Sequence, residues 1–338
     1  MKAQGGLRST DAYGDPCMRH LVILSASVLG AALVLAACAM AGSKASENPF
    51  GSTPLWVDPD SQAAEDAARL RSIRPGDARR LQRIARRPQA VWLAGSAEAV
   101  RTSADGVASS AARAGAMPVL VAYNAPLRDC RGQSGGGART ARAYRRWVRA
   151  LAAGIGGRRA VVVLEPDALA GLDCLPRAPR RQRVALLRRA VRLLEARPRV
   201  AVYIDAGHSA WQPPALMARR LLAAGLHHAR GFALNVSNFR RTRTEVAYGT
   251  RIARLTGGKP FVVDTSRNGR GPAQLGEWCN PPGRALGTPP RTRRLPSRLV
   301  DALLWIKRPG ESDGECRGGP PAGAWWRDYA LELARSAG

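Results

Sequence analysis

Two carboxylates follow a strongly apolar segment in the middle of the chain: Glu165 and Asp167 lie in VVVLEPDAL, residues 161–169. Four apolar residues in a row suit a strand buried on both faces, as in a parallel sheet. An acid at the end of such a strand reaches the rim where α/β barrels and open α/β sheets carry catalytic groups. Asp167 is therefore the first candidate catalyst. Alternatively, both acids only cap a short helix at 168–171, since Asp favours N-caps and proline often begins helices.

The same pattern recurs along the chain. Apolar segments such as 117–123, 200–204 and 303–306 run into polar residues, and helical patterns such as 63–85 and 324–337 alternate with them. This alternation, at least six times over, predicts an α/β fold with a parallel barrel and a site at its C-terminal rim. The polar strand-end residues are Tyr123, Asp129, Asp167, Asp205, His208, Asn235, Asn238, Asp264, Lys307, Glu311 and Asp313.

The residue types at these strand ends favour carbohydrate chemistry. Several carboxylates occur together with Trp92, Trp211 and Trp278. Flat indole faces stack on sugar rings, and a pair of acids can hydrolyse a glycosidic bond. We expect no metal, because His208 has no second ligand near it in sequence, and no nucleotide cofactor, because the glycine-rich segment 131–140 lacks phosphate-binding spacing.

The N-terminal residues predict export. Residues 21–37 form an apolar run after Arg19, typical of a signal peptide. LAAC at 35–38 is similar to a bacterial lipobox with Cys38 as the lipid-modified residue; the alternative is an ordinary secretory signal. We therefore expect a signal peptide at 1–38, a short linker at 39–47 and a catalytic domain at 48–338, either extracellular or anchored to the outer face of the cell membrane.

The cysteines fit an exported protein. Cys130, Cys174, Cys279 and Cys316 belong to the expected mature domain, and none of them has CxxC spacing. Metal ligation is therefore a poor interpretation, and two disulfides are expected. The residues alone leave three pairings open.

The formal net charge of +28 comes mostly from arginine, clustered for example at 142–149, 180–192 and 291–294. The sequence contains no recognisable nucleic-acid module and no basic segment interleaved with aromatic residues. We interpret the excess as arginine-rich helix faces with non-specific affinity for anionic envelope polymers, rather than as a nucleic-acid site. An exported polyanion-binding protein is the corresponding alternative function.

Six motifs, in order, resemble glycoside hydrolase family 6 in its actinobacterial form, the inverting β-1,4-glucanases of the endoglucanase and cellobiohydrolase type. The likeness runs from about residue 48 to the C-terminus. The motifs are YNAPLRDC (123–130), LEPDAL (164–169), YIDAGHSAW (203–211), DTSRNG (264–269), WCNP (278–281) and WIKRPGESDG (305–314).

The resemblance implies a distorted parallel barrel of fewer than eight strands with substrate in a cleft across its rim. It implies that Asp167 is the general acid, that Asp129 keeps Asp167 protonated and helps relay a proton, and that Asp313 matches the residue often proposed as the base. Like-charge repulsion between carboxylates gives the physical reason for a protonated Asp167. We interpret Asp205 and Asp264 as structural.

The resemblance also implies substrate contacts and disulfide pairs. Tyr123 would press on the ring at the cleavage subsite, Trp92 would stack further out, and Ser134 would orient the attacking water. The pairs would be Cys130–Cys174 and Cys279–Cys316. Further sugar contacts would be His208, Trp211, Asn235, Asn238, Trp278, Lys307 and Glu311.

The short segment 315–322 lacks the long roof loops of the exo-acting type. We therefore expect a monomeric endo-acting β-1,4-glucanase. The alternatives are an exo-acting cellobiohydrolase and a non-catalytic glycan-binding protein on the same fold.

Overall fold

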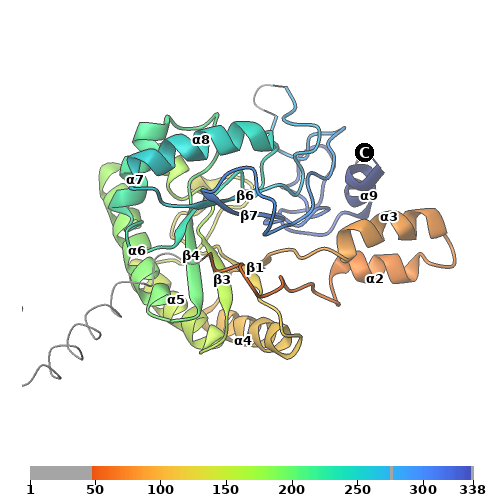
Figure 1. Cartoon of the computed structure of the whole chain (residues 1–338), viewed down its shortest axis with the longest axis horizontal. Coiled ribbons are helices and arrows are strands. Elements are labelled where there is room, and N and C mark those ends of the chain that lie inside the picture. Colours follow the sequence, from red (N-terminus) through yellow and green to blue (C-terminus); the bar gives the residue numbers. More distant parts are fainter. Residues whose placement is uncertain (1–47, 275–276, 336–338) are drawn as a thin grey trace, which may run out of the picture. The chain divides into compact units, whose positions relative to one another are not determined.

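The centre of the protein is a sheet of seven parallel strands, whose order in space follows their order in the chain (Figure 1). The computed structural model describes residues 48–274 and 277–335. The curled, all-parallel sheet confirms the predicted α/β class and the distorted barrel of fewer than eight strands. The strands are β1 (Val91–Leu93), β2 (Val119–Ala122), β3 (Ala160–Leu164), β4 (Val200–Asp205), β5 (Gly231–Leu234), β6 (Phe261–Asp264) and β7 (Val300–Leu304).

Helices follow most of the strands and cover the outside of the barrel (Figure 1). Ser96 caps α4 by accepting a hydrogen bond from the Ala99 N–H (3.0 Å), and Thr140 caps α5 in the same way through the Ala143 N–H (3.1 Å). The helices are α2 (Gln62–Arg69), α3 (Pro75–Ala85), α4 (Ala97–Arg113), α5 (Ala141–Ile155), α6 (Arg177–Glu195), α7 (Pro214–Ala223), α8 (Thr242–Leu255) and α9 (Arg327–Arg335), with 3₁₀ turns η1 (Asp129–Arg131) and η2 (Ala170–Cys174).

The segment expected as one helix over 63–85 is two helices, α2 and α3. Pro75 begins α3, and Arg74 before it has a non-helical ψ of 67°. A residue that precedes proline is excluded from the helical region by the proline ring, so the chain must break there. The helix expected from 324 begins instead at Arg327, and β7 begins three residues and ends two residues earlier than predicted.

Alternate residues of each strand enter two different cores. Val161 and Val163 of β3 belong to an interior cluster with Phe50, whose ring lies 6.1 Å from that of Tyr203. Val162 and Leu164 belong to the larger cluster that includes the helices. Because both faces of the sheet are apolar and buried, polar groups are confined to the strand ends.

The two edge strands meet at a seam. The Ala90 N–H donates to the Trp305 carbonyl oxygen (3.0 Å), and Arg308 Nε donates to the Ala90 carbonyl oxygen (2.9 Å). Trp92 Nε1 donates to the Ile306 carbonyl oxygen (2.8 Å). These contacts bring the segment that follows β7 beside the start of β1.

The predicted signal peptide, Cys38 and the linker to residue 47 lie outside the described residues. Within the described residues, no helix combines the length and apolar character needed to cross a membrane.

Candidate active site

Buried carboxylates at the strand ends hold the rim loops. Glu165 follows β3, and its two oxygens accept hydrogen bonds from the backbone N–H groups of Asn124 and Ala125 (2.8–3.0 Å) in the loop after β2. Burial raises the pKa of Glu165 to about 7, although these N–H donors oppose the shift. Glu165 thus ties together the two loops that carry Asp129 and Asp167.

Asp205 and Asp264 also hold loops together by accepting hydrogen bonds from backbone N–H groups. These contacts agree with the interpretation of both residues as structural. Asp205 Oδ2 accepts from the N–H groups of Asp167 (2.9 Å) and Gly207 (3.0 Å). Asp264, which is fully buried, accepts from the backbone N–H groups of Ser237, Ser266, Ile306 and Lys307 (2.9–3.2 Å). One side chain therefore fixes the loops after β5, β6 and β7.

Asp167 lies half-buried beyond Glu165, with a left-handed backbone (φ 68°) that its bond to Asp205 stabilises. Burial raises the pKa of Asp167 well above its usual value, and the charges of Asp205, Asp129 and Asp313 raise it further. Within residues 48–274 and 277–335, no cation forms an ion pair with it. Asp167 is therefore held as a neutral acid, able to donate a proton.

Asp129 is positioned by a strained and heavily bonded loop. Leu127, Asp129 and Cys130 all have positive φ (47–57°). Buried Arg183 of α6 donates to the carbonyl oxygens of Pro126 and Leu127 (2.7 Å each). Asp129 Oδ2 accepts from the Ser134 N–H (2.7 Å), so Ser134 lies beside this carboxylate through its backbone.

The disulfide pairs implied by the family resemblance are both formed. Cys130 pairs with Cys174 next to Asp129, and Cys279 pairs with Cys316 next to Asp313. Each bridge therefore anchors a loop that carries a candidate catalytic carboxylate.

Asp313 has surroundings opposite to those of Asp167. Its Oδ2 accepts from Arg267 Nη1 (2.9 Å), and both side chains are buried. Its Oδ1 lies 3.9 Å from Lys307 Nζ. The Asn280 N–H also donates to Asp313, and the Asn280 side-chain oxygen accepts from the Asp313 N–H. Two cations thus compensate the charge of this carboxylate.

Tyr123 and Trp92 form an aromatic corner between these acids and the seam. Their rings meet edge to face at 5.1 Å, and the Arg128 guanidinium lies 4.3 Å from the Tyr123 ring centre. Burial raises the pKa of Tyr123, and the charges of Asp167 and Asp129 raise it further, so the phenol stays protonated beside both carboxylates. Lys307 Nζ lies 5.9 Å from the Trp92 ring.

Other expected sugar contacts are accessible. His208 and Trp211 lie side by side, with ring centres 5.6 Å apart, and Trp211 is 39% exposed. Burial and Arg240 lower the pKa of His208 to about 4, and its Nδ1 accepts from the Ala210 N–H, which leaves an Nε2–H as donor. Trp278 is 50% exposed. A hollow of about 360 Å³ beside it is lined by Gln133, Glu277, Trp278, Cys279, Cys316 and Arg317.

The structure does not support a sugar contact by Asn235. This side chain is fully buried, its amide donates to the carbonyl oxygens of Arg240 and Asp264, and its oxygen accepts from the Arg240 N–H. All of its hydrogen-bonding groups are used to hold the loop after β5.

Asn238 is half-buried and remains at the rim. Buried Glu311 lies 3.6 Å from Arg308 and 3.9 Å from Lys307.

Sequence reasoning overlooked the residues that support the acids. Arg267 and Asn280 lie inside the recognised motifs DTSRNG and WCNP. For Arg267, the available signal was an arginine that follows a buried strand. No sequence signal marked Glu245 on α8. Its side chain is fully buried and accepts a hydrogen bond from the Ser209 N–H (3.1 Å), next to His208. In the described part of the chain, no group of three or more His, Cys, Asp or Glu could hold a metal ion.

The site thus combines a neutral carboxylic acid, further carboxylates and exposed indole rings at the C-terminal rim of a parallel barrel. This is the class of carbohydrate-active hydrolases. A family model described as "Glycosyl hydrolases family 6" matches residues 50–337. The chain belongs to this family and is a glycoside hydrolase.

Named relatives cover most of the chain. It is 45% identical over 292 residues to "Endoglucanase A" of Cellulomonas fimi, covering 86% of this chain and 62% of that protein. It is 48% identical over 270 residues to "Endoglucanase 1" of Streptomyces sp. (strain KSM-9), covering 77% and 73%. The endoglucanase Cel6 from Mycobacterium tuberculosis, solved with methyl-cellobiosyl-4-deoxy-4-thio-β-D-cellobioside, aligns with a TM-score of 0.82 at 45% identity, covering 86% and 99%.

The buried carboxylates predict a pH-dependent stability. Burial raises the pKa values of Glu165, Asp205 and Glu245 to about 7, so the folded protein keeps protons that the unfolded chain loses near pH 4. The free energy of unfolding should therefore fall as the pH rises from about 5 to about 7.5. His208, with its pKa lowered to about 4, acts in the opposite direction but is a single group. Urea unfolding across this range measures the slope.

The control is Glu245→Gln, because the glutamine oxygen can still accept from Ser209 but cannot titrate. Its slope should be shallower by up to about 1.4 kcal/mol per pH unit. Equal slopes in both proteins would show that Glu245 is ionised throughout.

Proposed function

We propose that this protein hydrolyses internal β-1,4-glucosidic bonds of cellulose or a related β-glucan with inversion, using Asp167 as the general acid. The observation that carries the proposal is the contrast between two carboxylates: Asp167 faces three other acids, whereas Asp313 is paired with Arg267 and Lys307. One group is set up to give a proton and the other to remain charged. Divergent environments of this kind mark acid and base roles.

In the proposed reaction, Asp167 gives its proton to the glycosidic oxygen as the bond from the anomeric carbon to that oxygen breaks. A water molecule attacks the opposite face of the anomeric carbon, and its proton passes by way of Asp129 to the Asp313 carboxylate, which then releases it to solvent. Tyr123, which is neutral and packed between Trp92 and Arg128, supports the ring at the point of cleavage. Asp167 is then reprotonated from solvent.

Two observations support internal cleavage. Trp211 and Trp278 remain 39% and 50% exposed, as side chains in an open cleft would be. A long polymer can enter such a cleft along its length rather than by its end. The three similar proteins described above are all named as endoglucanases.

We further propose that the protein is exported and anchored through a lipid on Cys38. The apolar segment 21–37 followed by cysteine supports this location, and so does the pair of disulfides, which form in oxidising compartments.

Substitution should separate the acid from the other carboxylates. Asp167→Ala should nearly abolish cleavage of natural glucan but keep much of the rate on an aryl cellobioside with an acidic leaving group, which departs without protonation. Asp129→Ala and Asp313→Ala should lose activity on both substrates, because water must be activated in either case. An Asp167→Ala enzyme equally inactive on both substrates would move the acid role to another carboxylate.

Hydrolysis of soluble carboxymethylcellulose tests the reaction itself. Viscosity should drop much faster than reducing ends appear, and proton NMR of fresh cello-oligosaccharide hydrolysate should show the α-anomer first. Cellobiose release with little loss of viscosity would indicate exo action. A β-anomer as first product would exclude the inverting mechanism.

The lipid anchor predicts a mature chain that begins at a diacylated Cys38. Mass spectrometry of the N-terminal peptide from native membranes should give that mass. An unmodified start at Ala39 or beyond, with protein free in the medium, would contradict the anchor.

A further inference from the structure

Two neighbouring helices of this protein, α5 and α6, are rich in arginine. Four arginines lie in α5 and seven in α6, against one acidic residue, Glu195. The Glu195 carboxylate accepts hydrogen bonds from the backbone N–H groups of Val202 and Arg230. The next helix pair, α7 and α8, carries two and three arginines and also one acidic residue. The arginine content of α5 and α6 is therefore higher than that of the next helix pair.

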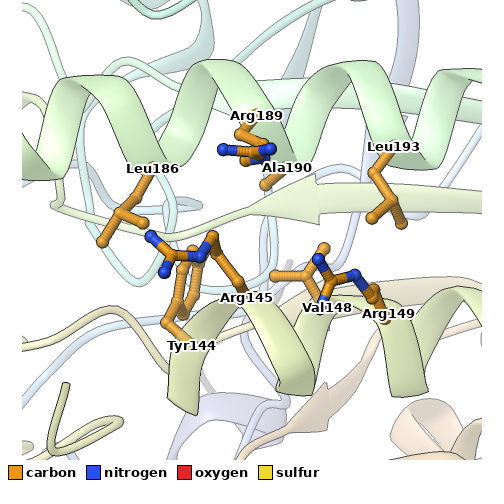
Figure 2. A pocket seen from close by; sticks show the side chains of 8 residues that line it. All are labelled: Tyr144, Arg145, Val148, Arg149, Leu186, Arg189, Ala190 and Leu193. Atoms are coloured by element: carbon orange, nitrogen blue, oxygen red, sulfur yellow. The ribbon is translucent and has the colours of Figure 1, made fainter. Parts of the chain in front are cut away.

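A shallow groove runs between these two helices. Figure 2 shows Arg145 and Arg149 on α5 facing Arg189 on α6 across it. The enclosed volume is only about 10 Å³, so the groove cannot surround a small molecule, and a ligand there would have to lie on the surface. Its lining also includes Tyr144, Val148, Leu186, Ala190 and Leu193.

The charges that flank this groove are not compensated by the protein. Among the described residues, no ion pair is formed by Arg145, Arg149 or Arg189, and Arg149 and Arg189 are exposed. Most exposed arginines of the described residues likewise form no ion pair, and these three differ from the others in lining one groove together. Three like charges held together without an acid repel one another, and a bound anion would relieve that repulsion.

We propose that the α5–α6 groove binds a linear polyol phosphate polymer, a flexible chain of phosphodiester-linked aliphatic units. Guanidinium groups bind phosphate oxygens in a bidentate manner. Arg145 and Arg149 are one helical turn apart, roughly 6 Å, so successive arginines can meet successive phosphates of an extended chain. Leu193, which is half-buried, gives the aliphatic units an apolar contact.

The groove argues against nucleic acid as the occupant. Single-stranded nucleic acid is bound by stacking its bases on accessible aromatic side chains. The aromatic residue among the lining residues is Tyr144, which is 1% exposed and lies under the floor. Phosphates therefore have partners in the groove, while bases would have none.

The groove and the glucan site lie on different parts of the barrel. The groove is formed by α5 and α6 on the outside of the barrel (Figure 1). The carboxylates lie on loops at the strand ends. A polymer in the groove would hold the enzyme on an anionic surface and leave the rim free. This inference does not depend on the proposed reaction.

The test measures binding of the purified protein to soluble poly(glycerol phosphate) at several salt concentrations. The variant R145Q/R149Q/R189Q should bind about tenfold or more weakly at low salt, and its slope of log affinity against log salt should be shallower by about two to three. The matched control R219Q/R251Q/R254Q removes the same charge from exposed positions on α7 and α8 and should change both values much less.

Three outcomes would overturn the proposal. Equal losses in both triple variants would mean that only net charge matters, and unchanged binding in the groove variant would place the contact elsewhere. Tighter binding of single-stranded DNA than of poly(glycerol phosphate) would exclude the proposed occupant. Far-ultraviolet circular dichroism and the urea unfolding midpoint of both triple variants should equal those of the parent protein, which shows that folding is intact.

Discussion

The rim of this barrel depends on buried carboxylates that accept hydrogen bonds from backbone N–H groups of neighbouring loops. Glu165 binds the loop after β2, Asp205 the loop after β3, and Asp264 the loops after β5 and β7. A buried N–H without a partner costs about 1–3 kcal/mol, so each carboxylate strongly selects one loop conformation. The positive φ of Asp129 and Asp167 persists because these contacts hold it.

This arrangement has an electrostatic consequence. Buried acids placed so close together raise one another's pKa values, and the effect is greatest where no cation is near. Asp167 occupies that position, while Arg267 and Lys307 compensate Asp313. Asp205, which holds the loop after β3, thus also helps to keep the proton on the candidate acid.

The outer surface of the helices is under fewer packing constraints than the rim. The helices need apolar residues only on the face toward the sheet, so their outer positions are free to carry charge. In α5 and α6 these positions are occupied by arginine almost without acidic partners. A surface of this kind adds a binding property without altering the core or the rim.

Much of this protein could be predicted from its sequence, because strand and helix periodicities and strand-end acids are local signals. The fold class, the strand-end positions of Asp129, Asp167 and Asp313, and the family follow from such signals. Other features depend on which residues meet in space. Asn235 carries the same amide as Asn238, yet it is buried and fully bonded, and Glu245 reaches Ser209 from a distant helix. The sequence does not distinguish Arg267 from Arg145. Arg267 is buried and paired with Asp313, whereas Arg145 lines a groove whose arginines have no acidic partner among the described residues. Burial and partners, which determine what a polar side chain does, are set by long-range packing and therefore only by the tertiary structure.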